Sequence, residues 1–217
     1  GLRLGTSQGS LKPILDELRR FEARIISILS SYGRVTPAQR DGWRARHLGF
    51  LPQRLHLSDA LTVRDNLGLV YFAAGLPVDT SAMAVALDSL GIQDLQGRRP
   101  QELSGGQAQH VALARAVLLA PRVILADEPT ASLDPHAKRD IESLMSQWAS
   151  EPQPDGLART LVFASHNLGQ VKRIATRVLC LESGRVLADL PVQDFFNAEV
   201  LARVSPEAHA FVQGEMA

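Results

Sequence analysis

The sequence has almost no cysteine, no long apolar run and no net charge. Its 217 residues include one cysteine, Cys180, and 23 basic side chains balance 23 acidic ones. One cysteine excludes an internal disulfide framework, and its apolar neighbours predict a buried structural thiol. Balanced charge gives no field toward nucleic acid or an anionic membrane. No apolar run approaches the roughly 18 residues of a membrane span, so we expect a soluble chain.

Length and composition are those of a single globular domain. A chain of 217 residues builds one substantial core but leaves no room for two full-sized domains with linkers. The 45% hydrophobic and 21% charged content is ordinary for a folded protein. We therefore expect one domain over residues 1–217.

The most informative stretch is residues 103–134, which begins with the letters LSGGQ. Ser104, Gly105 and Gly106 stand directly before an apolar run with helical periodicity. Backbone N–H groups at a helix start are unpaired, and the helix dipole favours negative charge there. This stretch therefore predicts a glycine loop that opens a helix and suits a phosphate.

A buried strand is predicted next. Pro121 ends the helix, because proline removes a donor and disfavours helix in the residue before it. Residues 123–126 are a short apolar run, typical of a strand inside a parallel sheet. Asp127 and Glu128 follow at the carboxyl end, where open α/β sheets bind ligands. An aspartate there can hold Mg²⁺, and a glutamate can orient or deprotonate a water.

The sequence LSGGQ, a helix, VILADEP and then ASLD, in this order and spacing, resembles the nucleotide-binding subunit of ATP-binding cassette (ABC) transporters. The resemblance implies a P-loop NTPase-like α/β fold, with a mostly parallel sheet flanked by helices and a helical subdomain inserted at about residues 58–105. It implies a transport-coupled ATPase that uses ATP and Mg²⁺.

The resemblance also implies roles for individual residues. Asp127 would hold Mg²⁺ and Glu128 would act as general base. Gln53 would lie in a mobile loop and touch Mg²⁺ or the attacking water. His166, which follows the predicted strand 160–164, would contact the γ-phosphate.

Two further elements would act between subunits. Ser104, Gly105, Gly106 and Gln107 would bind the nucleotide held by a second ATPase subunit, identical or different, with Ser104 and Gly106 at its γ-phosphate. Asp134 would lie in the loop that crosses the dimer interface. Transmembrane permease subunits would be partners, a substrate-binding protein is left open, and nucleic acid is not expected. Such a chain would be cytoplasmic and would lie on the inner face of the cell membrane through its permease.

The N-terminal residues depart from the family pattern. The loop G-x-x-x-x-G-K-[ST] is missing, and its nearest approach is residues 5–13, where Lys12 comes one place late and Pro13 replaces the hydroxyl. Two interpretations remain open: a degenerate phosphate loop that includes Lys12, or an unrelated helical segment. The strands and the adenine-stacking aromatic that precede this loop in the family have no counterpart, so we expect an N-terminally incomplete domain.

Two parts of the sequence resemble transporters of different substrates. GFLPQ and LADEPTASLD resemble ATPases of lipoprotein-release and macrolide-export systems, whereas the later residues 163–170 and 194–196 resemble tungstate and related oxyanion importers. We favour oxyanion import, because the tail should diverge most between subfamilies. A third alternative is a catalytically degenerate subunit that acts as a structural or complementing half.

Local patterns predict the remaining elements. Thr62, with Asp65 three residues later, resembles a capping box that opens a helix. The other predicted elements are a helix over 81–90 ending at Gly91, a helix over about 136–148, and strands over 160–164, 177–181 and 185–188, the last two joined as a hairpin.

Overall fold

The computed structural model describes residues 42, 44, 46–152, 156 and 158–214. Within them the chain forms two compact units, the first ending at Ala164 and the second described from Ser165 onward. Among the described helices, none is both long enough and apolar enough to span a membrane.

A three-stranded parallel sheet organises the first unit. Its order is β1-β2-β3, with bounds Leu48–Leu51, Val123–Asp127 and Thr160–Ala164. The central strand β2 pairs in parallel on both sides, so Asp127 stands opposite Ala164 and Ala126 opposite Leu51. The predicted burial of β2 is confirmed, since Ile124 is fully buried. Strand β1 was not predicted, because four residues that include a glycine give little β signal.

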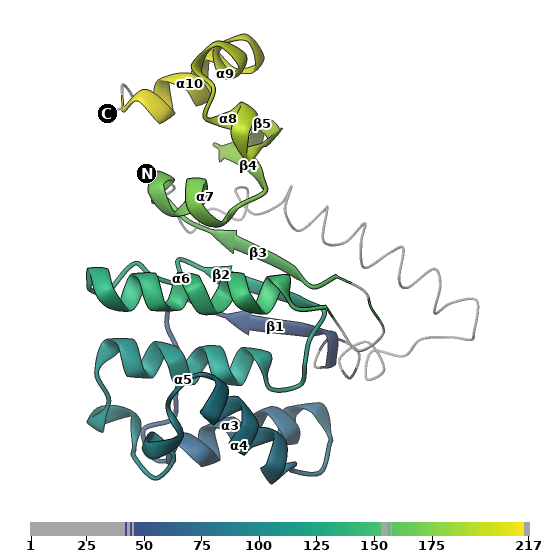
Figure 1. The fold of residues 1–217 in the computed structure, drawn as a ribbon, viewed down its shortest axis with the longest axis vertical. Coiled ribbons are helices and arrows are strands. Elements are labelled where there is room, and N and C mark those ends of the chain that lie inside the picture. Colours follow the sequence, from purple (N-terminus) through teal and green to yellow (C-terminus); the bar gives the residue numbers. More distant parts are fainter. Residues whose placement is uncertain (1–41, 43, 45, 153–155, 157, 215–217) are drawn as a thin grey trace, which may run out of the picture. The chain divides into compact units, whose positions relative to one another are not determined.

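Two helices pack against this sheet: α5 (Gly105–Val117) contacts β1, and α6 (Pro135–Ser150) contacts β3 and α5 (Figure 1). The α5 contact is close enough to require glycine, because a Cβ at Gly49 would overlap the carbonyl oxygen of Ala116. Helix α5 ends at Val117, three residues before the predicted end. The predicted helix over 136–148 is confirmed with slightly wider bounds.

Helices α3 (Val63–Ala74) and α4 (Thr80–Ser89) lie beside α5 (Figure 1), followed by the short 3₁₀ turns η1 (Gln93–Leu95) and η2 (Pro100–Glu102). The three α-helices share an apolar core, which includes Leu67, Leu87 and Val111. All four elements before α5 lie within the residues predicted as a helical subdomain.

The predicted cap of α3 is confirmed in part. The Thr62 hydroxyl accepts from the Asp65 N–H at 3.2 Å, as expected. The Asp65 carboxylate, however, accepts from the Thr62 hydroxyl at 2.6 Å. The side chain of Asp65 is shorter than the glutamate of a full capping box, and it takes the nearer hydroxyl as donor.

The second unit is built on an antiparallel hairpin, β4 (Arg177–Glu182) and β5 (Arg185–Pro191). The hairpin was predicted, and it forms a two-stranded sheet of its own. Four helices accompany it: α7 (Leu168–Ile174), α8 (Val192–Phe195), α9 (Ala198–Val204) and α10 (Pro206–Gln213).

Cys180 lies on β4, next to a bulge, and packs against the core of this unit. It is half-buried, not fully buried as predicted, because the bulge interrupts the alternation of the strand. Burial raises the pKa of the Cys180 thiol, with a smaller contribution from the charge of Glu182.

Candidate functional site

The carboxyl end of β2 holds a carboxylate that its surroundings do not satisfy. Asp127 is the last residue of the strand, and its Oδ1 is buried with no hydrogen-bond partner in the described part of the chain. Burial raises the pKa of the Asp127 carboxyl, and the charge of Glu128 raises it further. An unpaired buried carboxylate oxygen costs free energy, and a bound cation would offset that cost.

The next residue opens a strained turn, residues 128–133, which we call the Glu128 turn. Glu128 has φ +48°, a conformation that side chains with a Cβ rarely adopt. Its N–H donates to the carbonyl of Ala164 at 3.0 Å, and its own carbonyl accepts from the N–H of Ala131 at 3.2 Å. Such strain persists only where the surroundings enforce it, and it is concentrated at functional sites.

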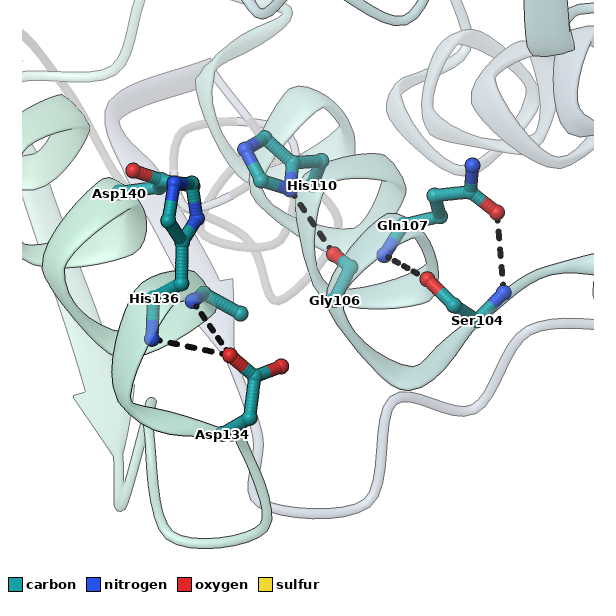
Figure 2. Close-up of polar contacts among 8 residues, drawn as sticks. Ser104, Gly106, Gln107, His110, Asp134, His136 and Asp140 are labelled. Atoms are coloured by element: carbon teal, nitrogen blue, oxygen red, sulfur yellow. Dashed lines mark hydrogen bonds and ion pairs between the residues drawn. The ribbon is translucent and has the colours of Figure 1, made fainter.

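The start of α5 satisfies its own polar groups. The Ser104 hydroxyl accepts from the Gln107 N–H at 3.2 Å, and the Gln107 side-chain oxygen accepts from the Ser104 N–H at 3.0 Å (Figure 2). Gly105 is exposed, and Gly106 packs so closely that an added Cβ would lie 3.2 Å from that of Ala137. The predicted glycine loop therefore opens the helix through a full capping box, and its first turn presents backbone N–H groups.

Asp134 opens the neighbouring helix α6. Its Oδ1 accepts from the N–H groups of His136 at 2.9 Å and Ala137 at 3.1 Å (Figure 2). These backbone hydrogen bonds lower the pKa of Asp134. The family resemblance predicts only the interface loop for Asp134, although an aspartate directly before Pro135 is a recognisable cap signal. The contact of Gly106 with Ala137 places the two helix starts side by side.

The other candidate residues lie in different parts of the chain. Gln53 is exposed and follows Leu51, the Cα partner of Ala126, so it leaves β1 at the same sheet edge as Asp127. His166 is exposed and belongs to the second unit. Lys12 lies outside the described residues.

The available ligands suit a cation that needs few protein groups. No group of three or more His, Cys, Asp and Glu side chains in the described residues is arranged to hold a metal ion. Mg²⁺ at nucleotide sites takes one or two protein ligands and completes its shell with phosphate and water oxygens. The unpaired Oδ1 of Asp127 fits that requirement.

The model of the family described as ABC transporter matches residues 22–131, half of the chain. The chain belongs to the ABC transporter family. The matched part of this ABC chain includes Gln53, the LSGGQ residues and the Glu128 turn as far as Ala131, and it does not include the irregular loop at 5–13.

Curated relatives of this ABC chain are ATP-binding proteins of several transport systems. It is 37% identical to the methionine import ATP-binding protein MetN of Cupriavidus necator over 70% of this chain and 43% of MetN. It is 32% identical to the molybdenum import ATP-binding protein ModC of Paramagnetospirillum magneticum, over 90% and 53%. It is 30% identical to the macrolide export protein MacB of Psychrobacter arcticus, over 88% and 28%. The chain thus spans about half or less of each relative's length.

Solved structures show the same fold. The ATP-binding cassette MJ0796, in a dimeric post-hydrolysis state bound to ADP and Pi, aligns with a TM-score of 0.62 and 26% identity over 72% of this chain and 68% of that one. An inward-facing metal-chelate type ABC transporter aligns with a TM-score of 0.61 and 27% identity over 73% and 64%. The predicted fold class, an ABC ATPase with a parallel sheet flanked by helices, is confirmed.

Proposed function

We propose that this chain is the ATP-binding and ATP-hydrolysing subunit of an ABC transporter. The observation that carries the proposal is the end of β2, where Asp127 Oδ1, which has no hydrogen-bond partner among the described residues, adjoins a second carboxylate on a strained turn. Two adjacent carboxylates do not stabilise the fold, because burial and the charge of Glu128 disfavour the ionised form of Asp127 and raise its pKa. Phosphoryl transfer to water uses both, one for a cation and one for the water.

In this proposal, Asp127 and Gln53 would hold Mg²⁺, and the bound ion would supply positive charge against the phosphate oxygens. Glu128 accepts the proton of the attacking water, the new bond forms between the water oxygen and the γ-phosphorus, and the bond to the ADP oxygen breaks. His166 contacts the γ-phosphate. The products are ADP and inorganic phosphate.

The LSGGQ residues act on a second subunit's nucleotide. Ser104, Gly105, Gly106 and Gln107 present the first turn of α5, whose N–H groups and dipole favour the γ-phosphate. Asp134 stands at the neighbouring helix start and contributes to the same interface. The dimeric state of the ADP-bound cassette MJ0796 supports this arrangement. Movement of the two ATPase subunits during ATP binding and hydrolysis would be passed to transmembrane permease subunits. These permease subunits would hold the chain at the inner face of the membrane.

The transported substrate we propose is an oxyanion of the tungstate and molybdate type. Support comes from the two molybdenum import relatives, whose alignments cover 90% and 78% of this chain. The export alternative keeps the support of MacB, which aligns over 88% of it. A complementing half-site subunit remains the alternative that residues 5–13 favour, because they lack the regular phosphate loop.

Calorimetric titration with ATP and Mg²⁺ tests the proposal on the wild-type chain and on Lys12→Ala. Binding by the wild type that is lost in Lys12→Ala would support a working loop at residues 5–13. Equal binding by both would support ATP binding and exclude Lys12 from the site. An absence of heat from both would contradict ATP binding and favour the complementing half.

The substrate is tested separately, in membrane vesicles that contain the chain with its permease. ATP-dependent accumulation of tungstate or molybdate would support oxyanion import. Export of a macrolide by the same vesicles would overturn it. Accumulation of methionine in place of the oxyanions would also overturn it, since MetN is 37% identical to this chain.

A further inference from the structure

Helix α5 holds the Glu128 turn through a buried amide. Gln109 lies on α5, two residues after the end of the LSGGQ motif, and is 6% exposed. Its Nε2 donates to the carbonyl oxygen of Pro129 at 2.7 Å, across 20 residues of sequence. Gln109 is one of the buried residues of α5, together with Val111 and Ala112, and a buried amide is costly unless it is hydrogen-bonded. The contact therefore fixes the turn firmly to the helix.

The turn is held from two sides. Glu128 donates its N–H to Ala164 on β3, and the following residue accepts from Gln109 on α5. Proline has no N–H, so the carbonyl of Pro129 is the only backbone group through which that residue can be anchored by a hydrogen bond. Glu128, which supplies the N–H of the first anchor, has φ +48°. The direction of the Glu128 side chain thus depends on both anchors.

The same helix holds the loop that follows β1. Two turns beyond Gln109, Arg115 donates from Nη1 to the carbonyl of His56 at 3.0 Å and from Nη2 to the carbonyl of Leu55. His56 has φ +49°, so this loop also contains a strained residue. Residues 53–56, which we call the Gln53 loop, are thus tied to α5 by a planar guanidinium that spans two carbonyls.

We propose that Gln109 and Arg115 are positioning residues that fix the Glu128 turn and the Gln53 loop to helix α5. The inference rests on the proposed function, in which α5 begins at the γ-phosphate of one nucleotide while Glu128 and Gln53 act on another. One rigid helix then joins the two sites. A nucleotide bound at Ser104 would therefore influence both loops through helix α5, without any change in the sheet.

Amide hydrogen exchange tests the first anchor without any need for activity. Gln109→Met keeps the length of the side chain and removes its donor. We expect exchange at the turn amides of Ala131 and Leu133 to rise about tenfold, since the Pro129 oxygen loses its partner. Val111→Ala is the matched control, because it opens a cavity in the apolar core beside the same helix and leaves the hydrogen bond to the turn in place. Equal exchange of the turn in both variants, at matched global stability, would overturn the proposal.

Steady-state ATP hydrolysis by the chain with its partner subunits provides the second readout. Gln109→Met should lower kcat about tenfold and leave the KM for ATP within about twofold, because the residue acts through Glu128. In a Glu128→Gln background it should then cause no further loss. An additional tenfold loss in that background would mean that Gln109 acts elsewhere. If the wild type hydrolyses no ATP, the proposed function fails, whereas the exchange experiment still decides the anchor.

Limited digestion with trypsin tests the second anchor. Arg54 is exposed and lies inside the Gln53 loop, so cleavage after it reports how firmly Arg115 holds the loop. Arg115→Met should speed this cleavage several-fold, Arg115→Lys should do so less, and Gln109→Met should leave it at the wild-type rate. Mass spectrometry identifies the cut. An unchanged rate in Arg115→Met, or an equal rise in Gln109→Met, would refute separate anchoring of the two loops.

Discussion

The start of α5 and the end of β2 both carry polar groups, but they differ in whether those groups are hydrogen-bonded. At the helix start, Ser104 and Gln107 satisfy each other in a closed capping box. At the strand end, a buried oxygen of Asp127 finds no hydrogen-bond partner in the described part of the chain, and Glu128 adopts a strained backbone conformation. The first region satisfies these polar groups within itself. The second carries a cost that a bound cation would relieve.

This difference separates the two proposed roles. A loop that only receives a phosphate from another subunit needs donors held in place, and a capped helix start provides them. A centre that performs chemistry needs a carboxylate that has not been neutralised by the protein itself, even though the fold would be more stable without it. The predictions below change one region at a time.

The largest expected effect is on turnover at the strand end. Glu128→Gln removes the proposed base and keeps the shape of the side chain, so ATP hydrolysis should fall about 10²- to 10⁴-fold. Phosphate release measures the rate, and gel filtration with ATP shows whether a closed dimer accumulates. Turnover equal to that of the wild type would refute Glu128 as the base.

Asp127→Asn should separate activity from stability. Without Mg²⁺ at pH 8, the free energy of unfolding should rise by a few tenths to about 1 kcal/mol, because a partly solvated charge is removed from a site that disfavours it. Mg²⁺-dependent ATP binding should weaken at the same time. Urea unfolding in the presence of a chelator measures the first effect.

The pH dependence of that gain follows from the raised pKa of Asp127. The wild-type carboxyl is neutral in both states below its ordinary value of 3.8, and it costs stability as the pH rises through its folded pKa. The advantage of Asp127→Asn should therefore be present at pH 8 and vanish below about pH 4. A constant advantage at every pH would contradict this account.

Ser104→Ala removes one of the two hydrogen bonds of the capping box at the start of α5. Loss of the capping hydroxyl should cost about 1 kcal/mol and lower the unfolding midpoint by roughly 2–4 °C. Ser104→Thr retains a hydroxyl and serves as the control. Thermal unfolding followed by circular dichroism distinguishes them, and an equal drop in both variants would show that the cap contributes little.

The smallest effect is expected at Asp134, which caps α6. Asp134→Asn keeps an acceptor for the N–H groups of His136 and Ala137 but loses the charge that favours a helix start. Because these bonds lower the pKa of Asp134, its charge stabilises the fold above the ordinary value of 3.8, and this stabilisation is lost as the pH falls through the folded pKa. The variant should unfold slightly earlier at pH 7 and together with the wild type near pH 2. A gap that persists in acid would contradict the prediction.

The sequence by itself determined the elements whose signals are local. The glycine loop, α5, the buried strand β2 and the cap at Thr62 could all be predicted, because their hydrogen bonds and periodicities join residues a few positions apart. The family was readable for the same reason, since LSGGQ and the strand with Asp127 and Glu128 are contiguous motifs.

Only the tertiary structure decided the rest. Strand β1, which the sequence did not predict, is defined by its pairing with β2, and Gly49 allows it to approach Ala116 closely. The contact from Gln109 to Pro129 joins residues 20 apart, and the contact from Arg115 to His56 joins residues 59 apart. No local pattern specifies such partners, because they depend on which elements pack together. The Asp127 oxygen that has no partner among the described residues is a further case, because burial and the supply of donors are properties of the assembled fold.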